Sequence, residues 1–238
     1  LFRSVVFELG EYRHAADVFA ELSEFCVSGR IESAARVSEA WNMRAQIYGG
    51  NDPNLGGVPQ DSLTELHFVY AEYLVMQERF EQAQEVLQRV IEAERTAERW
   101  PRMGVSWENG FATVEDLVVS GTSGESILGR LSLAYSAWIA AREGDVDRAA
   151  PTFRRLTRDV GLLTHDPYGA WYHHLYSTVL PTERPPARDD RLTVLAKAVK
   201  YLQERTSRIE RYQDKLRYSQ SNLWNRQIIA AARQHNLM

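Results

Sequence analysis

The chain has 238 residues, of which 44% are hydrophobic and 11% aromatic, so it can form a folded core and is not a disordered segment. The formal net charge of −4 excludes no class of partner, although the charge is uneven: residues 188–238 hold 11 Lys and Arg against 5 Asp and Glu, and the rest is acidic. Cys26 is the only cysteine, which rules out an internal disulfide and favours a small buried side chain in a reducing, cytoplasmic protein.

No apolar run approaches the ~18 residues that a membrane-spanning helix needs. No signal peptide is visible in the sequence. The chain begins at Leu1 rather than Met, and residues 1–9 resemble only the end of a helix. We therefore expect a trimmed or processed fragment of a longer chain.

The first third of the chain is predicted to be helical with one long loop. Residues 11–25 and 31–48 have apolar side chains at helical spacing. Residues 49–60 hold four glycines and two prolines, which no helix or central strand sustains. Asp61 or Ser62 is the expected N-cap of the next helix.

Residues 66–91 are predicted to form two antiparallel amphipathic helices joined by a turn at 77–79. Ala71 and Ala83 are the small residues that let the two backbones approach closely. Such a pair cannot bury both of its apolar faces alone, so it needs neighbouring pairs.

The second half of the chain continues with helices of different lengths. A short helix at 113–119 and a breaker at 121–124 precede a long apolar helix, 127–142. Its return helix, 146–162, contains Pro151, which a helix tolerates only in its first turn, so we expect a start near Asp147 or Arg148, or a kink. An aromatic-rich helix follows at 168–180.

The C-terminal region is predicted to be a proline-rich linker, 181–188, and one helix from 189 to about 236. If unbroken, that helix would be roughly 70 Å long. This divides the chain into a helical domain at 1–180, the linker, and a terminal helix within 189–238.

One spacing recurs three times. Ala15, Ala83 and Ala149 are each followed by Phe or Leu four residues later and by Leu or Val after seven, and they lie 68 and 66 residues apart. Ala71 and Ala137 each stand twelve residues before the second and third of these alanines. The pattern resembles the tetratricopeptide (TPR) repeat family, whose units are antiparallel helix pairs of ~34 residues. The alternative is an ordinary helix bundle with alanines at its crossings.

The resemblance implies an all-α superhelix, a solenoid of TPR-like hairpins, with a concave groove for a peptide or partner helix. It implies a non-enzymatic scaffold or adaptor. The candidate partner-binding residues are side chains of the first helices that the core does not claim: His67, Tyr73, Gln77, Arg130, Tyr135 and Arg142. The alternative for each is an ordinary solvated helix face.

The terminal helix carries a seven-residue repeat. Its aliphatic positions are Leu195, Leu202, Ile209, Leu216 and Leu223. Such a narrow seam is typical of a coiled coil, which would make a homo-oligomer, and it equally suits a long cap on the solenoid.

A basic stripe is predicted on another face of the same helix. It consists of Lys197, Lys200, Arg208, Arg211 and Lys215. It would meet nucleic acid phosphate, an anionic membrane or an acidic partner, or be simply solvated. The second functional hypothesis is therefore a regulatory or sensory helical domain of a larger nucleic-acid-associated protein.

No catalytic or cofactor site is predicted. His173 and His174 are adjacent, so on a helix they point about 100° apart and do not share a metal ion. The glycines at 121–126 resemble a phosphate-binding loop but lack its lysine. Cys26 and His14 have no third group that would complete a nucleophilic site.

Overall fold

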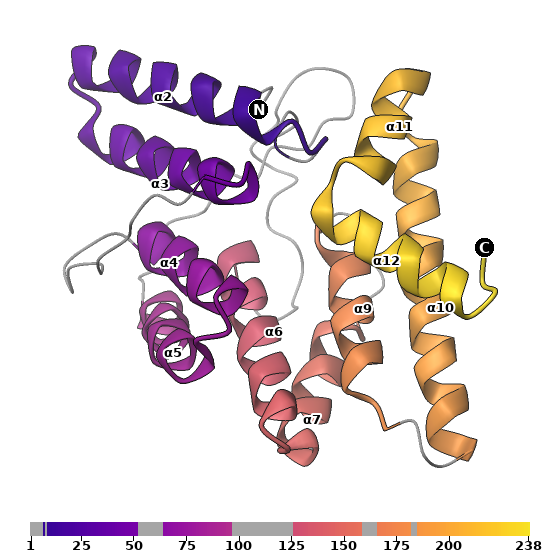
Figure 1. The fold of residues 1–238 in the computed structure, drawn as a ribbon. Helices are drawn as coiled ribbons and strands as arrows, with labels where there is room; N and C mark the ends of the chain where they lie inside the picture. Colours follow the sequence, from indigo (N-terminus) through magenta and orange to yellow (C-terminus); the bar gives the residue numbers. More distant parts are fainter. Residues whose placement is uncertain (1–6, 8, 52–63, 97–125, 159–165, 182–184) are drawn as a thin grey trace, which may run out of the picture.

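The computed structural model describes residues 7, 9–51, 64–96, 126–158, 166–181 and 185–238 (Figure 1). In these ranges the regular structure consists of ten helices and no strand. Consecutive helices pack as pairs along a curved path, so the predicted all-α superhelical arrangement is confirmed. The predicted helix at 113–119, the caps at Asp61 or Ser62 and most of residues 1–9 lie outside the described ranges.

Four antiparallel pairs make up most of the path. They are α2 (Tyr12–Ser28) with α3 (Glu32–Tyr48), α4 (Thr64–Met76) with α5 (Phe80–Thr96), α6 (Ile127–Arg142) with α7 (Val146–Leu156), and α9 (Gly169–Val179) with α10 (Pro185–Ser207). Figure 1 shows them in this order from indigo to orange. Each pair contacts the next one along the chain.

The turns within the first three pairs are built alike. Arg30, Glu78 and Gly144 have positive φ angles of 59°, 57° and 99°. In each turn the next residue donates its N–H to a carbonyl five residues earlier, at distances of 2.8, 2.9 and 2.9 Å. This is the Schellman ending of a helix, in which one left-handed residue reverses the chain. A shared turn gives the three pairs the same local geometry.

The alanines that were predicted to allow close helix crossings are buried. Ala15, Ala83 and Ala149 are 0% exposed, and so is Ala71. The residues four positions later are also buried, at Phe19, Leu87 and Phe153. The shared spacing therefore marks equivalent contacts within successive pairs, and this part of the prediction is confirmed.

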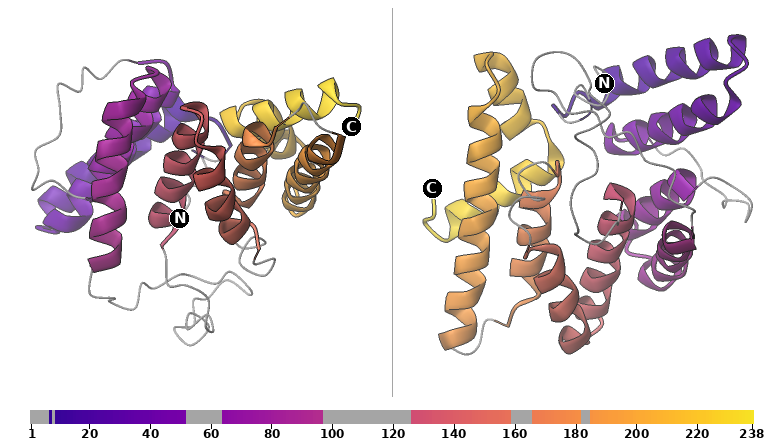
Figure 2. Two further views of the ribbon diagram at one scale, coloured as in Figure 1. Left: turned by 90° about the horizontal axis from the view of Figure 1, so that it is seen from below. Right: turned by 180° about the vertical axis from the view of Figure 1, so that it is seen from behind.

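The C-terminal region differs from the single long helix that was predicted. It forms α10, α11 (Tyr212–Gln220) and α12 (Leu223–Gln234). α12 turns back and packs on α9 and α10, as Figure 2 shows. Folding back lets Ile228 and Ala232 join a buried cluster with Leu202, and this burial outweighs helix continuity. The Asn222 side chain then caps α12 by accepting from the Asn225 N–H at 3.1 Å.

Two helix boundaries around prolines also differ from the prediction. α10 begins at Pro185, inside the predicted linker 181–188, because a proline in the first turn lacks an N–H that the helix would not use. α7 begins at Val146, the first residue of the predicted return helix and not the later Asp147 or Arg148, and it keeps Pro151 in its interior. Asp145 caps that helix by accepting from the Arg148 N–H at 3.1 Å.

In the described parts of the chain, no helix has the length and apolar character needed to cross a membrane.

Candidate functional site

Three of the six residues predicted to line a partner-binding groove are instead inside the protein. His67, Arg130 and Tyr135 are at most 7% exposed. Their prediction as surface residues was wrong: the Tyr135 hydroxyl donates to the buried Glu72 at 3.2 Å, and Arg130 pairs with the buried Asp166 at 2.8 Å. Phe7 and Trp224 are buried at 2% and 5% exposure, with ring centroids 5.9 Å apart.

The other three predicted groove residues are accessible to different degrees. Tyr73 is half-buried against a small cluster between α3 and α4. Gln77, just after α4, and Arg142, the last residue of α6, are exposed. The Arg142 guanidinium lies 5.3 Å from the Trp138 ring centroid.

A fully buried ion pair joins α3 to α4 under the aromatic cover. Arg44 donates from Nε to Glu72 Oε2 at 2.6 Å and from Nη2 to Glu72 Oε1 at 2.8 Å. Its Nη1 donates to the Tyr168 hydroxyl at 2.9 Å. The hydroxyls of Tyr48 and Tyr135 donate to Glu72 Oε1 at 3.1 and 3.2 Å. Arg44 and Glu72 thus use most of their hydrogen-bonding capacity on each other and on three tyrosines.

Aromatic rings surround the Arg44 guanidinium. Six centroids lie 4.8–5.7 Å from its Cζ, those of Phe7, Trp41, Tyr48, Phe68, Tyr168 and Trp224. They come from segments throughout the sequence, so the cation joins the first pair to α4, α9 and α12. Ring quadrupoles attract a desolvated cation, which offsets part of the cost of burying it.

The environment inside this cluster raises the pKa values of Arg44, Tyr48 and Tyr135. Burial alone would lower the pKa of Arg44, but the Glu72 carboxylate outweighs it, and the pKa is raised well above its usual value. Burial, followed by the negative charge of Glu72, raises the pKa of Tyr48 and of Tyr135. Both phenols therefore stay protonated near neutral pH and can donate to Glu72.

A second buried ion pair continues the network. Arg130 Nε donates to Asp166 Oδ2 at 2.8 Å, and the Tyr172 hydroxyl donates to the same oxygen at 3.2 Å. Asp166 Oδ1 accepts from the backbone N–H of Tyr168 at 2.8 Å. Since the Tyr168 hydroxyl binds Arg44, this one residue connects the two ion pairs. In the described structure these charged groups face one another rather than solvent, so the network positions helices.

The basic stripe and the heptad seam are not features of one helix. Lys197 and Lys200 lie exposed on α10, whereas Arg208 follows its end, Arg211 precedes α11 and Lys215 lies on α11. The predicted continuous basic face is therefore wrong, because the break at residues 208–211 redirects it.

The seam is used within the chain. Leu195 and Leu202 are 2% and 3% exposed, buried where α10 packs on α9 and α12. Ile209, Leu216 and Leu223 are half-buried. Leu195 and Leu202 are therefore used within the chain, whereas a coiled coil would need the same side chains for another strand.

The two adjacent histidines are buried on α9. Burial lowers the pKa of His173, whose Nδ1 lies 3.0 Å from the Gly169 carbonyl oxygen. Burial also lowers the pKa of His174, to about 4, with a smaller effect of Arg191. The described residues contain no group of three His, Cys, Asp or Glu placed to hold a metal ion. Cys26 is buried, at 4% exposure.

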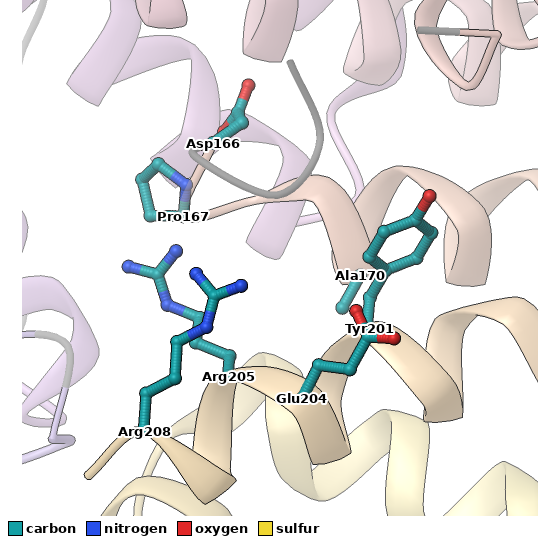
Figure 3. A pocket seen from close by; sticks show the side chains of 7 residues that line it. All are labelled: Asp166, Pro167, Ala170, Tyr201, Glu204, Arg205 and Arg208. Carbon is teal, nitrogen blue, oxygen red and sulfur yellow. The ribbon is translucent and has the colours of Figure 1, made fainter. Parts of the chain in front are cut away.

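One hollow was not anticipated from the sequence. It lies between the start of α9 and the end of α10 and is drawn in Figure 3. Its lining consists of Asp166, Pro167, Ala170, Tyr201, Glu204, Arg205 and Arg208. Two arginines three residues apart were the available signal, but their position opposite Pro167 depends on how α10 packs on α9.

These observations define an all-α protein of stacked helix pairs, closed by contact between its ends. Residues 116–236 match the model of the TP_0123_C family, which describes a C-terminal domain, and the chain belongs to that family. The match includes α6 to α12, and the matched model is not that of the TPR family. No curated protein and no solved structure matches the chain.

Proposed function

We propose that this chain is a non-enzymatic scaffold or adaptor that binds a protein or peptide through its TPR-like helix pairs. The observation that carries the proposal is the repeated construction of the first three pairs, with one kind of turn and buried alanines at equivalent positions. Stacked pairs of this kind form extended surfaces, which repeat proteins use to hold partners.

The surface favoured for this role is the edge that contains the α4–α5 turn and the end of α6. The Phe80 and Trp138 rings meet edge to face at 5.7 Å and are both only partly buried. Arg142 lies over Trp138, and Gln77 is exposed near the start of α5. Aromatic side chains beside an arginine are the residue types that most often dominate protein–protein contacts.

The surface above the Arg44–Glu72 pair is a weaker candidate for the partner site. The rings of Phe7 and Trp224 lie against Arg44 there, and a partner would have to displace both while leaving Arg44 and Glu72 paired. Exposing these buried charges would oppose such an exchange. The edge that contains the α4–α5 turn and the end of α6 needs no such rearrangement.

Photo-crosslinking in the cells that make the protein tests this assignment. A crosslinking amino acid at position 77 should give a discrete protein adduct, and one at exposed position 226 on α12 should not. Arg142→Glu should abolish the adduct, while Arg226→Glu should leave it unchanged. Adducts of equal yield from both positions, or none from position 77, would contradict the proposed surface.

A further inference from the structure

One side of α2 carries a partly exposed apolar stripe. Val18, Leu22 and Phe25 follow one another at spacings of four and three residues, so they share one side of the helix. Val18 and Leu22 are half-buried and lie outside the three buried clusters of the described structure, and Phe25 is 69% exposed. Ile31, just past the turn, is 49% exposed. We call these four residues the α2 stripe.

The turn after α2 brings Ile31 to the end of this stripe. The Ile31 N–H donates to the Cys26 carbonyl at 2.8 Å, in the Schellman ending described above. In such an ending the residue after the left-handed position commonly packs against the last turn of the helix. Figure 1 shows this turn at the outer end of the first pair, away from the other described helices. The α2 stripe therefore reaches an accessible edge of the molecule.

Ile31 occupies a position that local stability would give to a polar residue. It is the N-cap of α3, where its side chain accepts no hydrogen bond. Asp145 holds the equivalent position in the third pair and accepts from the Arg148 N–H at 3.1 Å. Isoleucine is among the poorest N-cap residues, and here it is not buried in compensation. A break of a local rule without a gain in packing is typical of a functional surface.

A row of carboxylates borders the α2 stripe. Asp17, Glu21 and Glu24 each precede a stripe residue by one position, which turns them about 100° around the helix. All three are exposed, and none forms an ion pair in the described structure. The sequence has no Lys or Arg between Arg13 and Arg30, so no basic side chain offsets the negative end of α2. The border therefore carries uncompensated negative charge.

We propose that the α2 stripe binds an amphipathic helix of a partner protein, whose apolar face is bordered by lysine or arginine. The apolar face covers Leu22, Phe25 and Ile31, and the cations meet the row of carboxylates. An anionic membrane suits this surface less, because the same carboxylates repel it. The site is on a different helix pair from the α4–α5 edge of the proposed function, and it does not depend on that proposal.

A fluorescent synthetic helix with a leucine face bordered by lysines is the probe. The same helix with glutamate in place of lysine is its control. Fluorescence anisotropy should show saturable binding of the lysine helix, and binding of the glutamate helix should be at least about tenfold weaker.

Two variants test the apolar contact. Phe25→Gln and Ile31→Ser should each weaken binding of the lysine helix about tenfold, the effect of losing one large apolar side chain from an interface. Because serine is a good N-cap residue, the melting temperature of Ile31→Ser should equal or exceed that of the parent, which excludes unfolding as the cause. Tyr212→Gln removes a ring on α11 that is also 69% exposed, and it should leave the affinity unchanged.

A second pair of variants tests the carboxylates. Glu21→Gln combined with Glu24→Gln should weaken the lysine helix about fivefold, and less in about 0.3 M salt, because salt screens exposed charges. Glu81→Gln combined with Glu85→Gln removes the same charge from exposed positions of α5 and should have little effect. Equal weakening by both combinations would mean that the overall charge alone attracts the lysine helix, and would overturn the proposal.

Vesicles of phosphatidylcholine test lipid as the other occupant of the stripe. The parent protein should stay in the supernatant when these vesicles are sedimented. Co-sedimentation that is lost in Phe25→Gln would assign the stripe to lipid and overturn the proposal. Equal binding of the glutamate helix, or unchanged affinity in both Phe25→Gln and Ile31→Ser, would overturn it as well. A negative crosslinking result at position 77 would count against the proposed function alone.

Discussion

Gly10 lies against the backbone of Asn222, so close that a Cβ added at Gly10 would be 2.5 Å from the Asn222 nitrogen. Next to this contact, the Leu223 N–H donates to the Tyr12 hydroxyl at 3.0 Å. Residues 211 positions apart in the sequence are thus in direct contact. The ends of the curved path close on each other, and this closure holds Trp224 over Arg44.

Gly10→Ala should weaken this closure. The residue has a φ of +80°, where an alanine is strained by about 1–2 kcal/mol, and its Cβ would also collide with backbone atoms. Gly144→Ala is the matched control, because Gly144 has a φ of +99° with nothing within 4 Å of the added Cβ. Urea unfolding should show a larger loss of stability for Gly10→Ala. Equal losses would mean that the close contact has no effect.

The Arg44–Glu72 pair should show strong coupling. Glu72→Gln leaves a buried cation without its counter-charge and should cost about 3–5 kcal/mol of the free energy of unfolding. Arg44→Met should cost a similar amount, and the double variant clearly less than the sum of the two. Lys200→Ala, which removes an exposed pair, should change stability by less than about 1 kcal/mol. Additive losses from the two buried changes would contradict direct coupling.

Local features of the sequence were sufficient to predict most of the helix pairs. The predicted helix 127–142 has the observed bounds, and the shared spacing after Ala15, Ala83 and Ala149 located buried crossings. Turn residues and small side chains act within a few positions of the chain, so their effects can be read locally.

The closure and the buried charges could not be predicted in this way. Arg130 follows a helical pattern that suggests an exposed polar face, and its partner Asp166 is 36 residues away. Trp224 covers a face built by residues more than 150 positions earlier, such as Tyr48. No glycine or proline marks the end of α10 in the sequence. The helix ends there so that Ile228 and Ala232 can be buried against another part of the chain, which a local pattern does not reveal.

Ala83→Arg tests the close approach of α4 and α5. The side chain is 0% exposed, so arginine adds both volume and an unpaired charge to a packed crossing. The expected cost is several kcal/mol, from about 1–3 kcal/mol of overpacking plus the burial of charge. Ala196→Arg, at an exposed position of α10, should leave the melting temperature nearly unchanged. A melting temperature of Ala83→Arg equal to that of the parent would contradict the crossing.

Ile209→Asp separates the two interpretations of the heptad seam. Ile209 lies between α10 and α11 and packs on the cluster that contains Leu202 and Ile228. Static light scattering should give the monomer mass for both parent and variant, while the variant loses stability because a charged group replaces a half-buried apolar side chain. A dimeric parent that becomes monomeric in the variant would instead show that the seam joins two chains.

The buried imidazole of His174 should make stability depend on pH. Its pKa falls from the usual 6.5 to about 4 in the folded protein, chiefly through burial. Between these two values the unfolded chain binds a proton that the folded chain does not, so the free energy of unfolding decreases as the pH falls from 6.5 to 4. Above pH 6.5 this contribution is constant, and its full loss amounts to about 3 kcal/mol.

His174→Phe isolates that contribution, because it removes the titrating group and keeps a ring beside Trp171, whose centroid lies 5.2 Å from that of His174. All other titratable groups are the same in both proteins, so their effect cancels in the comparison. Urea unfolding at pH 7, 5.5 and 4 should show the parent losing about 3 kcal/mol more than the variant over this range. Parallel losses would mean that His174 is protonated equally in the folded and unfolded states, and hence that the solvent reaches it on α9.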